Sequence, residues 1–148
     1  MTIIKNMNTA LGSRATWSLD PNPLYPMTFL DLFDVGSDHQ TALGCLKPGA
    51  SQHPHYHAAG ADIFLILHGG GELHSGHLGE NGQLNGALTV QNLTVGDLYS
   101  ITPFEVHSLV NTGSSDLVWL NVAPASHGDT DLIEVDAPIG KHGAFPSY

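Results

Sequence analysis

Three histidines fall within the stretch HPHYH at positions 53–57, and an aspartate follows at position 62. Imidazole nitrogens and carboxylate oxygens bind metals and carry protons, although a histidine-rich loop can also face water. If this stretch opens a strand, His55 and His57 point to the same face, because side chains alternate along a strand. His53 has the same parity, but Pro54 interrupts strand pairing, so we expect His53 to be solvated.

Further ligands must come from elsewhere in the chain. The turn AAGA at 58–61 can bring Asp62 back toward the two histidines, and the only later histidine flanked by a strand pattern is His107, in ITPFEVHSLVN. Three neutral imidazoles and one carboxylate form a mixed nitrogen and oxygen shell. Such a shell suits a divalent transition metal, namely Fe, Mn, Ni, Co, Cu or Zn, and is poor for Ca or Mg.

Short apolar runs separated by Gly, Pro and Asn-Gly turns dominate the middle of the chain. Strands are expected at 27–33, 40–47, 62–68, 71–78, 87–95, 97–101, 106–111 and 117–123. No stretch shows a 3.6-residue apolar period over three turns. The pattern predicts an all-β sandwich or barrel of one domain over residues 27–123. Residues 1–26 and 124–148 are expected to be arms that pack on the barrel or on a partner chain.

Two motifs resemble those of the cupin superfamily. The first runs from Gly49 through His55, Tyr56, His57 and Asp62 to Gly69 with the family's spacing, and has Asp62 where the family usually has Glu. The second runs from Gly96 through His107 to Asn111. It departs from the family at Thr102 and Phe104, where Pro and Gly are common.

The resemblance implies a small single-domain cupin, which is a jelly-roll β-barrel (a double-stranded β-helix) with a metal in its cavity. His55, His57, Asp62 and His107 carry over as ligands by position. Because Asp62 is one methylene shorter than Glu, it could coordinate directly, accept a water ligand or orient a neighbouring histidine. Single-domain cupins include oxygenases and non-redox isomerases or lyases. We favour a dioxygenase-like oxygenase, with isomerase or lyase chemistry and a non-catalytic binding module as alternatives.

Other side chains have both chemical and structural interpretations. Glu72 and Glu105 could place a general acid or base near the metal, although solvated acids at strand ends are the simpler interpretation. Tyr99 and Trp119 lie in apolar runs and are expected in the core. Asn111 is expected to satisfy backbone groups at a strand end.

Composition limits the partners of the chain. The 148 residues carry a net charge of −10, with only four Lys and Arg, so nucleic acid and anionic membranes are poor partners. Phosphorylated substrates usually need Arg or Lys, so an uncharged or weakly anionic small molecule fits better. Cys45 is the only cysteine and is expected to be a buried thiol. With no intrachain disulfide and no signal-peptide or membrane-span pattern, we expect a cytoplasmic protein. Exposed sheet edges favour a homodimer.

Overall fold

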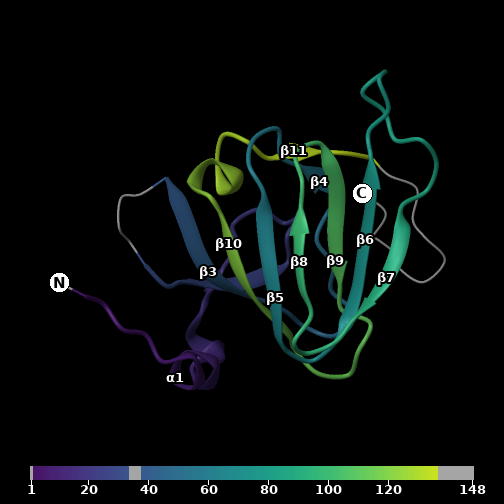
Figure 1. Ribbon diagram of the computed structural model, residues 1–148. Coiled ribbons are helices and arrows are strands. Elements are labelled where there is room, and N and C mark those ends of the chain that lie inside the picture. The colour runs from purple at the N-terminus through teal and green to yellow at the C-terminus, as the bar shows by residue number, and fades with distance from the viewer. Residues whose placement is uncertain (1, 34–37, 137–148) are drawn as a thin grey trace.

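The structure is a computed structural model that describes residues 2–33 and 38–136. In this part of the chain, strands form two antiparallel sheets that face each other (Figure 1). In spatial order, the first sheet contains β1 (Ser18–Leu19), β2 (Met27–Asp31), β3 (His39–Leu46), β10 (Leu117–Pro124), β5 (Asp62–His68) and β8 (Leu98–Ile101). The second contains β11 (Ile133–Glu134), β4 (His55–Tyr56), β9 (Glu105–Val110), β6 (Gly71–His77) and β7 (Thr89–Leu93). This arrangement is a double-stranded β-helix, the fold that the resemblance in the sequence implied.

The predicted all-β, single-domain fold is confirmed. All eight predicted strands are present, and each predicted end lies within two residues of the observed one. The pattern missed β1 and β11, which have two residues each and are too short to show alternation. The strand considered for the stretch HPHYH is present as β4, which is limited to His55 and Tyr56. It also missed α1 (Met7–Gly12), a six-residue helix whose N-cap is Asn6. A helix of this length has fewer than two turns and shows no readable 3.6-residue period.

The core lies between the two sheets, where apolar side chains of alternating strand positions meet. It consists of Leu46, Phe64, Ile66, Leu73, Leu93, Ile101, Leu109, Leu117 and Trp119. Trp119 was expected here and is buried, and the ring of Tyr99 stacks on Phe64 with 5.0 Å between centroids. Two of these residues, Phe64 and Trp119, also border an open cavity, so the core fills only part of the barrel.

A second apolar cluster covers the outer face of the first sheet. Trp17 packs there with Leu43, Cys45 and Val118, and α1 contributes Leu11. Cys45 is a buried thiol, as expected, and its burial, together with the charge of Asp116, raises its pKa. The N-terminal segment therefore protects one sheet face from water. Within residues 2–33 and 38–136, no helix is long and apolar enough to span a bilayer.

The contact between Gly44 and Trp119 gives a stability test. The two residues are paired across β3 and β10, and a Cβ at position 44 would overlap the indole ring of Trp119. We expect Gly44→Ala to lower the free energy of unfolding by about 1–3 kcal/mol, because the indole must move within a packed core. The measurement is urea denaturation. Gly12→Ala is the control, since no heavy atom lies within 4 Å of that added Cβ, and an equal loss in both variants would contradict this account.

Candidate metal centre

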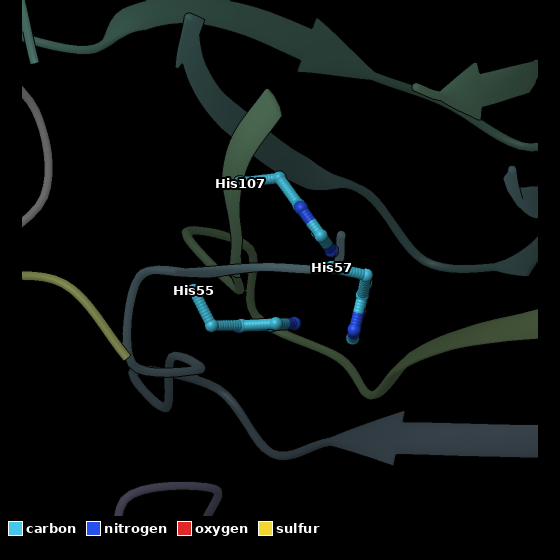
Figure 2. A group of neighbouring side chains, drawn as sticks. All are labelled: His55, His57 and His107. Atoms are coloured by element: carbon cyan, nitrogen blue, oxygen red, sulfur yellow. The ribbon is translucent and has the colours of Figure 1, made fainter. Parts of the chain in front are cut away.

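Three histidines meet in the barrel. His55 of β4 pairs with His107 of β9, and His57 follows directly after β4. The ring centroid of His107 lies 4.3 Å from that of His55 and 5.3 Å from that of His57. One ring nitrogen from each histidine lies within 4.8 Å of the other two, and all three side chains are buried. Figure 2 shows the three rings turned toward one another. The predicted convergence of these distant segments is therefore present.

Backbone carbonyls fix the orientation of all three rings. The Nδ1 atoms of His55, His57 and His107 contact the carbonyl oxygens of His53, Asp131 and Glu105, respectively, at 2.8, 2.5 and 3.0 Å. Because a carbonyl oxygen can only accept, each Nδ1 carries the hydrogen and donates it. Each neutral ring therefore has its lone pair on Nε2, which is the form that binds a metal.

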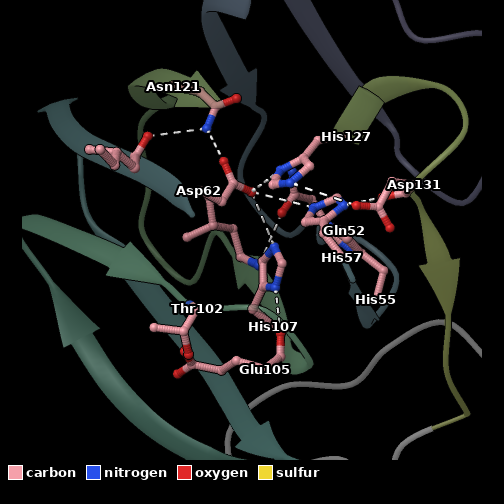
Figure 3. Close-up of polar contacts among 12 residues, drawn as sticks. Gln52, His55, His57, Asp62, Thr102, Glu105, His107, Asn121, His127 and Asp131 are labelled. Atoms are coloured by element: carbon pink, nitrogen blue, oxygen red, sulfur yellow. Dashed lines mark hydrogen bonds and ion pairs between the residues drawn. The ribbon is translucent and has the colours of Figure 1, made fainter. Parts of the chain in front are cut away.

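Asp62 completes the group from the first position of β5. Asn121 of β10 donates from Nδ2 to Asp62 Oδ1 at 2.5 Å, which orients the carboxylate. Its Oδ2 atom lies 3.4 Å from His57 Nε2 and 3.5 Å from His107 Nε2 (Figure 3). The shorter side chain thus still reaches the histidines, since Asn121 holds the carboxylate toward them.

Burial and charge set the protonation of these groups. Burial, reinforced by His107, lowers the pKa of His55 well below its usual value. Burial alone would raise the pKa of Asp62, but His107 and His57 outweigh it and the net pKa is lowered. Burial likewise opposes charge on His57, yet its contacts with Asp62 and Asp131 give a net rise in its pKa. The site therefore contains an ionised carboxylate and at least one imidazole that burial keeps neutral.

The donor set fits a transition metal. Two ligand atoms that each lie about 2.1 Å from one ion at a tetrahedral angle are about 3.4 Å apart. The distances from Asp62 Oδ2 to the two Nε2 atoms match this spacing. In addition, His107 Nε2 is buried and has no hydrogen-bond partner among the described residues. A buried nitrogen without a partner is costly, and a bound cation would remove that cost.

Two residues beyond the barrel, His127 and Asp131, brace this group. His127 lies in η2 (Ala125–Gly128), and its ring stacks on that of His57 with 3.8 Å between centroids and 4° between planes. The carboxylate of Asp131 accepts from the backbone N–H groups of Ala58 and Ala59 at 2.7 and 3.0 Å. These N–H groups lower the pKa of Asp131, although burial works against them. The segment therefore holds the loop that carries His57.

The sequence analysis did not single out His127, Asp131 or Asn121. The first two lie in the predicted C-terminal arm, where no strand pattern indicated a return to the barrel. Asn121 lies within a predicted strand and resembles any other polar strand residue. The expectation that His53 is solvated was wrong. His53 is buried, and its backbone bonds to Leu24 and His55 hold it in the structure.

The two candidate acids lie away from the histidines. Glu72 is on the opposite face of β6 from Leu73 and accepts from His74 Nε2 at 2.8 Å. Glu105 has the parity of His107, but its carboxylate turns back to accept from the backbone N–H and hydroxyl of Thr102. Neither acid lines the cavity described below. Their predicted general acid or base roles therefore have no geometric support from this arrangement.

The second motif departs from the family at a position with unusual backbone geometry. Phe104 has a φ of +64°, in the left-handed region that favours glycine, and its N–H donates to the His57 carbonyl at 2.9 Å. The family commonly has Gly at this position. Here the hydrogen bond to the His57 backbone accompanies the strained conformation. Asn111 behaves as expected, since its amide donates to the carbonyls of Leu46 and Ser115.

A cavity of about 750 Å³ is lined in part by His55 and His57 of the histidine group. Its lining includes the aromatic side chains of Tyr25, Phe29, Phe33, Phe64 and Trp119 and the carboxylates of Asp20, Asp31, Asp62 and Asp129. No Lys or Arg of the described residues lines it. Arg14 and Lys47 instead pair with Asp116 elsewhere on the protein. The lining of the cavity therefore combines aromatic side chains with acidic side chains.

The chain belongs to the cupin family, because the Cupin_2 model, described as a cupin domain, matches residues 42–123, more than half of the chain. No curated protein matches the sequence. The structural matches agree with the family assignment. One is a Cupin 2 conserved barrel domain protein from Salinispora arenicola, with 20% identity and a TM-score of 0.60, covering 86% of this chain and 92% of that one.

Two further solved structures share the fold. One is a conserved protein with a double-stranded β-helix domain from Klebsiella pneumoniae, with 22% identity, a TM-score of 0.58 and coverage of 84% of this chain and 95% of that one. The other is a predicted oxalate decarboxylase from Thermotoga maritima, with 27% identity and a TM-score of 0.55, covering 66% of this chain and 79% of that one. This chain is thus similar to small cupin barrels, and its buried histidine group could hold a metal ion.

The bracing role of Asp131 gives a test. We expect Asp131→Ala to weaken Co²⁺ or Zn²⁺ binding by about 10- to 100-fold, because the loop that carries His57 loses two backbone hydrogen bonds. The measurement is a competition titration with a chelator on protein whose folding is checked by circular dichroism. Asp136→Ala is the matched control, since Asp136 is an exposed acid of the same segment that does not line the cavity. Unchanged affinity in folded Asp131→Ala protein would contradict the bracing role.

Proposed function

We propose that this chain is a metal-dependent cupin enzyme in which His55, His57, His107 and Asp62 hold one divalent transition metal. The observation that carries the proposal is the set of backbone carbonyl bonds to Nδ1, which leaves the three Nε2 lone pairs free beside an oriented carboxylate. Three nitrogens and one oxygen suit Fe, Mn, Ni, Co, Cu or Zn.

The proposed reaction is a dioxygenation of a small molecule with vicinal oxygens. His55, His57, His107 and Asp62 would hold a redox-active ion, which would supply the one-electron chemistry that reaction with dioxygen requires. Both oxygen atoms enter the product, and the electrons that dioxygen accepts come from the substrate, so the reaction needs no external reductant. The chain's contribution is to hold the ligands, and the aromatic side chains Phe64 and Trp119 shield the site from bulk water.

The cavity charge supports an uncharged or weakly anionic substrate. A divalent ion together with the carboxylates of Asp62, Asp20, Asp31 and Asp129 would leave the cavity negative. An anion of high charge would find no Lys or Arg among the described lining residues to pair with it. The similar protein from Thermotoga maritima is described as a predicted oxalate decarboxylase, and oxalate is a dianion. We therefore propose a different substrate class for this chain.

Dioxygen uptake tests the proposed activity. Protein loaded anaerobically with Fe²⁺ is mixed with catechols, diketones and flavonols, and oxygen is followed with an electrode. We expect one compound class to consume about one dioxygen per substrate, and Fe²⁺-treated His107→Ala protein to lose at least 100-fold in rate. Uptake that is equal in the variant would contradict a reaction at this site.

Other outcomes of the same screen would favour one of the alternative functions over the oxygenase. Substrate conversion without oxygen consumption would replace the oxygenase proposal with isomerase or lyase chemistry. Ligands that raise the melting temperature without any conversion would instead favour a binding module. The homodimer stays a prediction, which sedimentation can test.

A further inference from the structure

His127 has one ring nitrogen engaged and one without a partner. Its Nε2 contacts the Ala59 carbonyl at 2.6 Å, so the hydrogen is on Nε2 and the lone pair is on Nδ1. The side chain is 5% exposed, and Nδ1 is buried without a hydrogen-bond partner among the described residues. A buried acceptor without a donor is unfavourable, because it has lost its hydrogen bonds to water. A bound molecule with a hydrogen-bond donor next to Nδ1 would therefore satisfy this nitrogen.

Distances alone would also allow His127 to share an ion with His57 and Asp62. The ring orientations exclude this, because an imidazole lone pair lies in the plane of its ring. The rings of His57 and His127 are parallel within 4° and stacked in van der Waals contact, which places the planes about 3.5 Å apart. An ion about 2.1 Å from His57 Nε2 in the plane of His57 lies well beyond bonding distance of His127 Nδ1. His127 is thus beside the metal position and is not a ligand.

The ion-pair contact of His127 Nδ1 is with an acceptor, the carboxylate of Asp62. The nearest carboxylate oxygen is Asp62 Oδ2 at 4.0 Å, and two acceptors cannot hydrogen-bond to each other. Figure 3 shows the ring of His127 next to the carboxylate of Asp62, with a dashed line marking this contact. No Lys or Arg among the described residues lines the cavity, so neither of these residue types supplies the missing donor. His127 itself lines the cavity, so a molecule bound there can reach it.

We propose that His127 is a specificity-determining residue whose Nδ1 accepts a hydrogen bond from a hydroxyl or amino group adjacent to the metal-binding oxygen of the ligand. The inference rests on the proposed function, because the ion anchors that oxygen. It narrows the ligand class to uncharged molecules with a vicinal donor, such as an ortho-diphenol or an α-hydroxyketone. Their O-methylated analogues keep the shape and lose the donor.

The test compares ligand pairs on metal-saturated protein. The pairs are catechol with 2-methoxyphenol and hydroxyacetone with methoxyacetone, and Kd is measured from the visible spectrum of the Co²⁺ protein. His127→Gln keeps a donor for the Ala59 carbonyl and removes the acceptor at Nδ1. His127→Asn is the matched variant, because its amide oxygen can occupy the position of Nδ1. His127→Phe keeps the stacked ring and serves as a second variant without an acceptor.

The expected result is a preference of the wild-type protein for the hydroxyl member of at least one pair. We expect His127→Gln and His127→Phe to reduce this preference about tenfold and His127→Asn to retain most of it. The ratio of the two Kd values is calculated for each protein, and these ratios are then compared between the wild type and the variants. This comparison removes the difference in chelating strength between the two ligands, because that difference is the same in every protein.

Three results would overturn the inference. The first is an unchanged preference for the hydroxyl ligand in both His127→Gln and His127→Phe. The second is failure of His127→Gln to bind Co²⁺ at a saturating concentration. The third is that the wild-type protein binds neither catechol nor hydroxyacetone at millimolar concentration. Failure of the proposed metal site is distinguishable from these results, since the wild-type protein would then bind no Co²⁺ at all. Failure of the oxygenase proposal alone is seen in the dioxygen-uptake assay and leaves these binding measurements unaffected.

Discussion

The site depends on the hydrogen bonds between imidazole rings and backbone carbonyls. A histidine ring has two nitrogens, and a metal binds a nitrogen that carries no hydrogen and whose lone pair points toward the metal. In this protein the carbonyls of His53, Asp131 and Glu105 take the hydrogens of three rings, and Ala59 takes that of His127. Since these carbonyls belong to the backbone of the folded barrel and its flanking segment, the fold itself selects the tautomers.

Without a bound cation, this arrangement lowers the stability of the folded protein. Buried nitrogens of His107 and His127 have no partner among the described residues, and burial opposes the charged forms of His55 and His57. The apolar core between the sheets and the cluster around Trp17 supply the stability that tolerates it. Functional sites commonly violate local rules that the rest of the fold obeys. The free nitrogens are therefore best understood as a preformed binding site.

Much of this could be predicted from the sequence. Strand positions followed from alternating apolar runs and turn residues, and the two motifs indicated a cupin barrel, which the family match and the topology confirm. The approach of His107 to His55 and His57 was also predictable. The side-chain parity of Glu105 was misleading, because its carboxylate turns to the backbone of Thr102 instead of the metal position.

The bracing residues could not be predicted, for a physical reason. His127 and Asp131 act through contacts with residues about 70 positions earlier in the chain, and neither lies in a strand whose register fixes a direction. The ring stacking of His127 on His57 depends on the path of a loop that leaves no periodic pattern. The left-handed backbone of Phe104 was hidden in the same way, since its residue type disfavours that conformation.

The central claim is that one cation binds where these histidines meet. Elemental analysis of purified protein tests it most directly, with wild type, His55→Ala and His107→Ala prepared side by side. The account predicts close to one equivalent of a transition metal in the wild-type protein and less than a tenth of that in both variants. Equal metal content in all three proteins would contradict it.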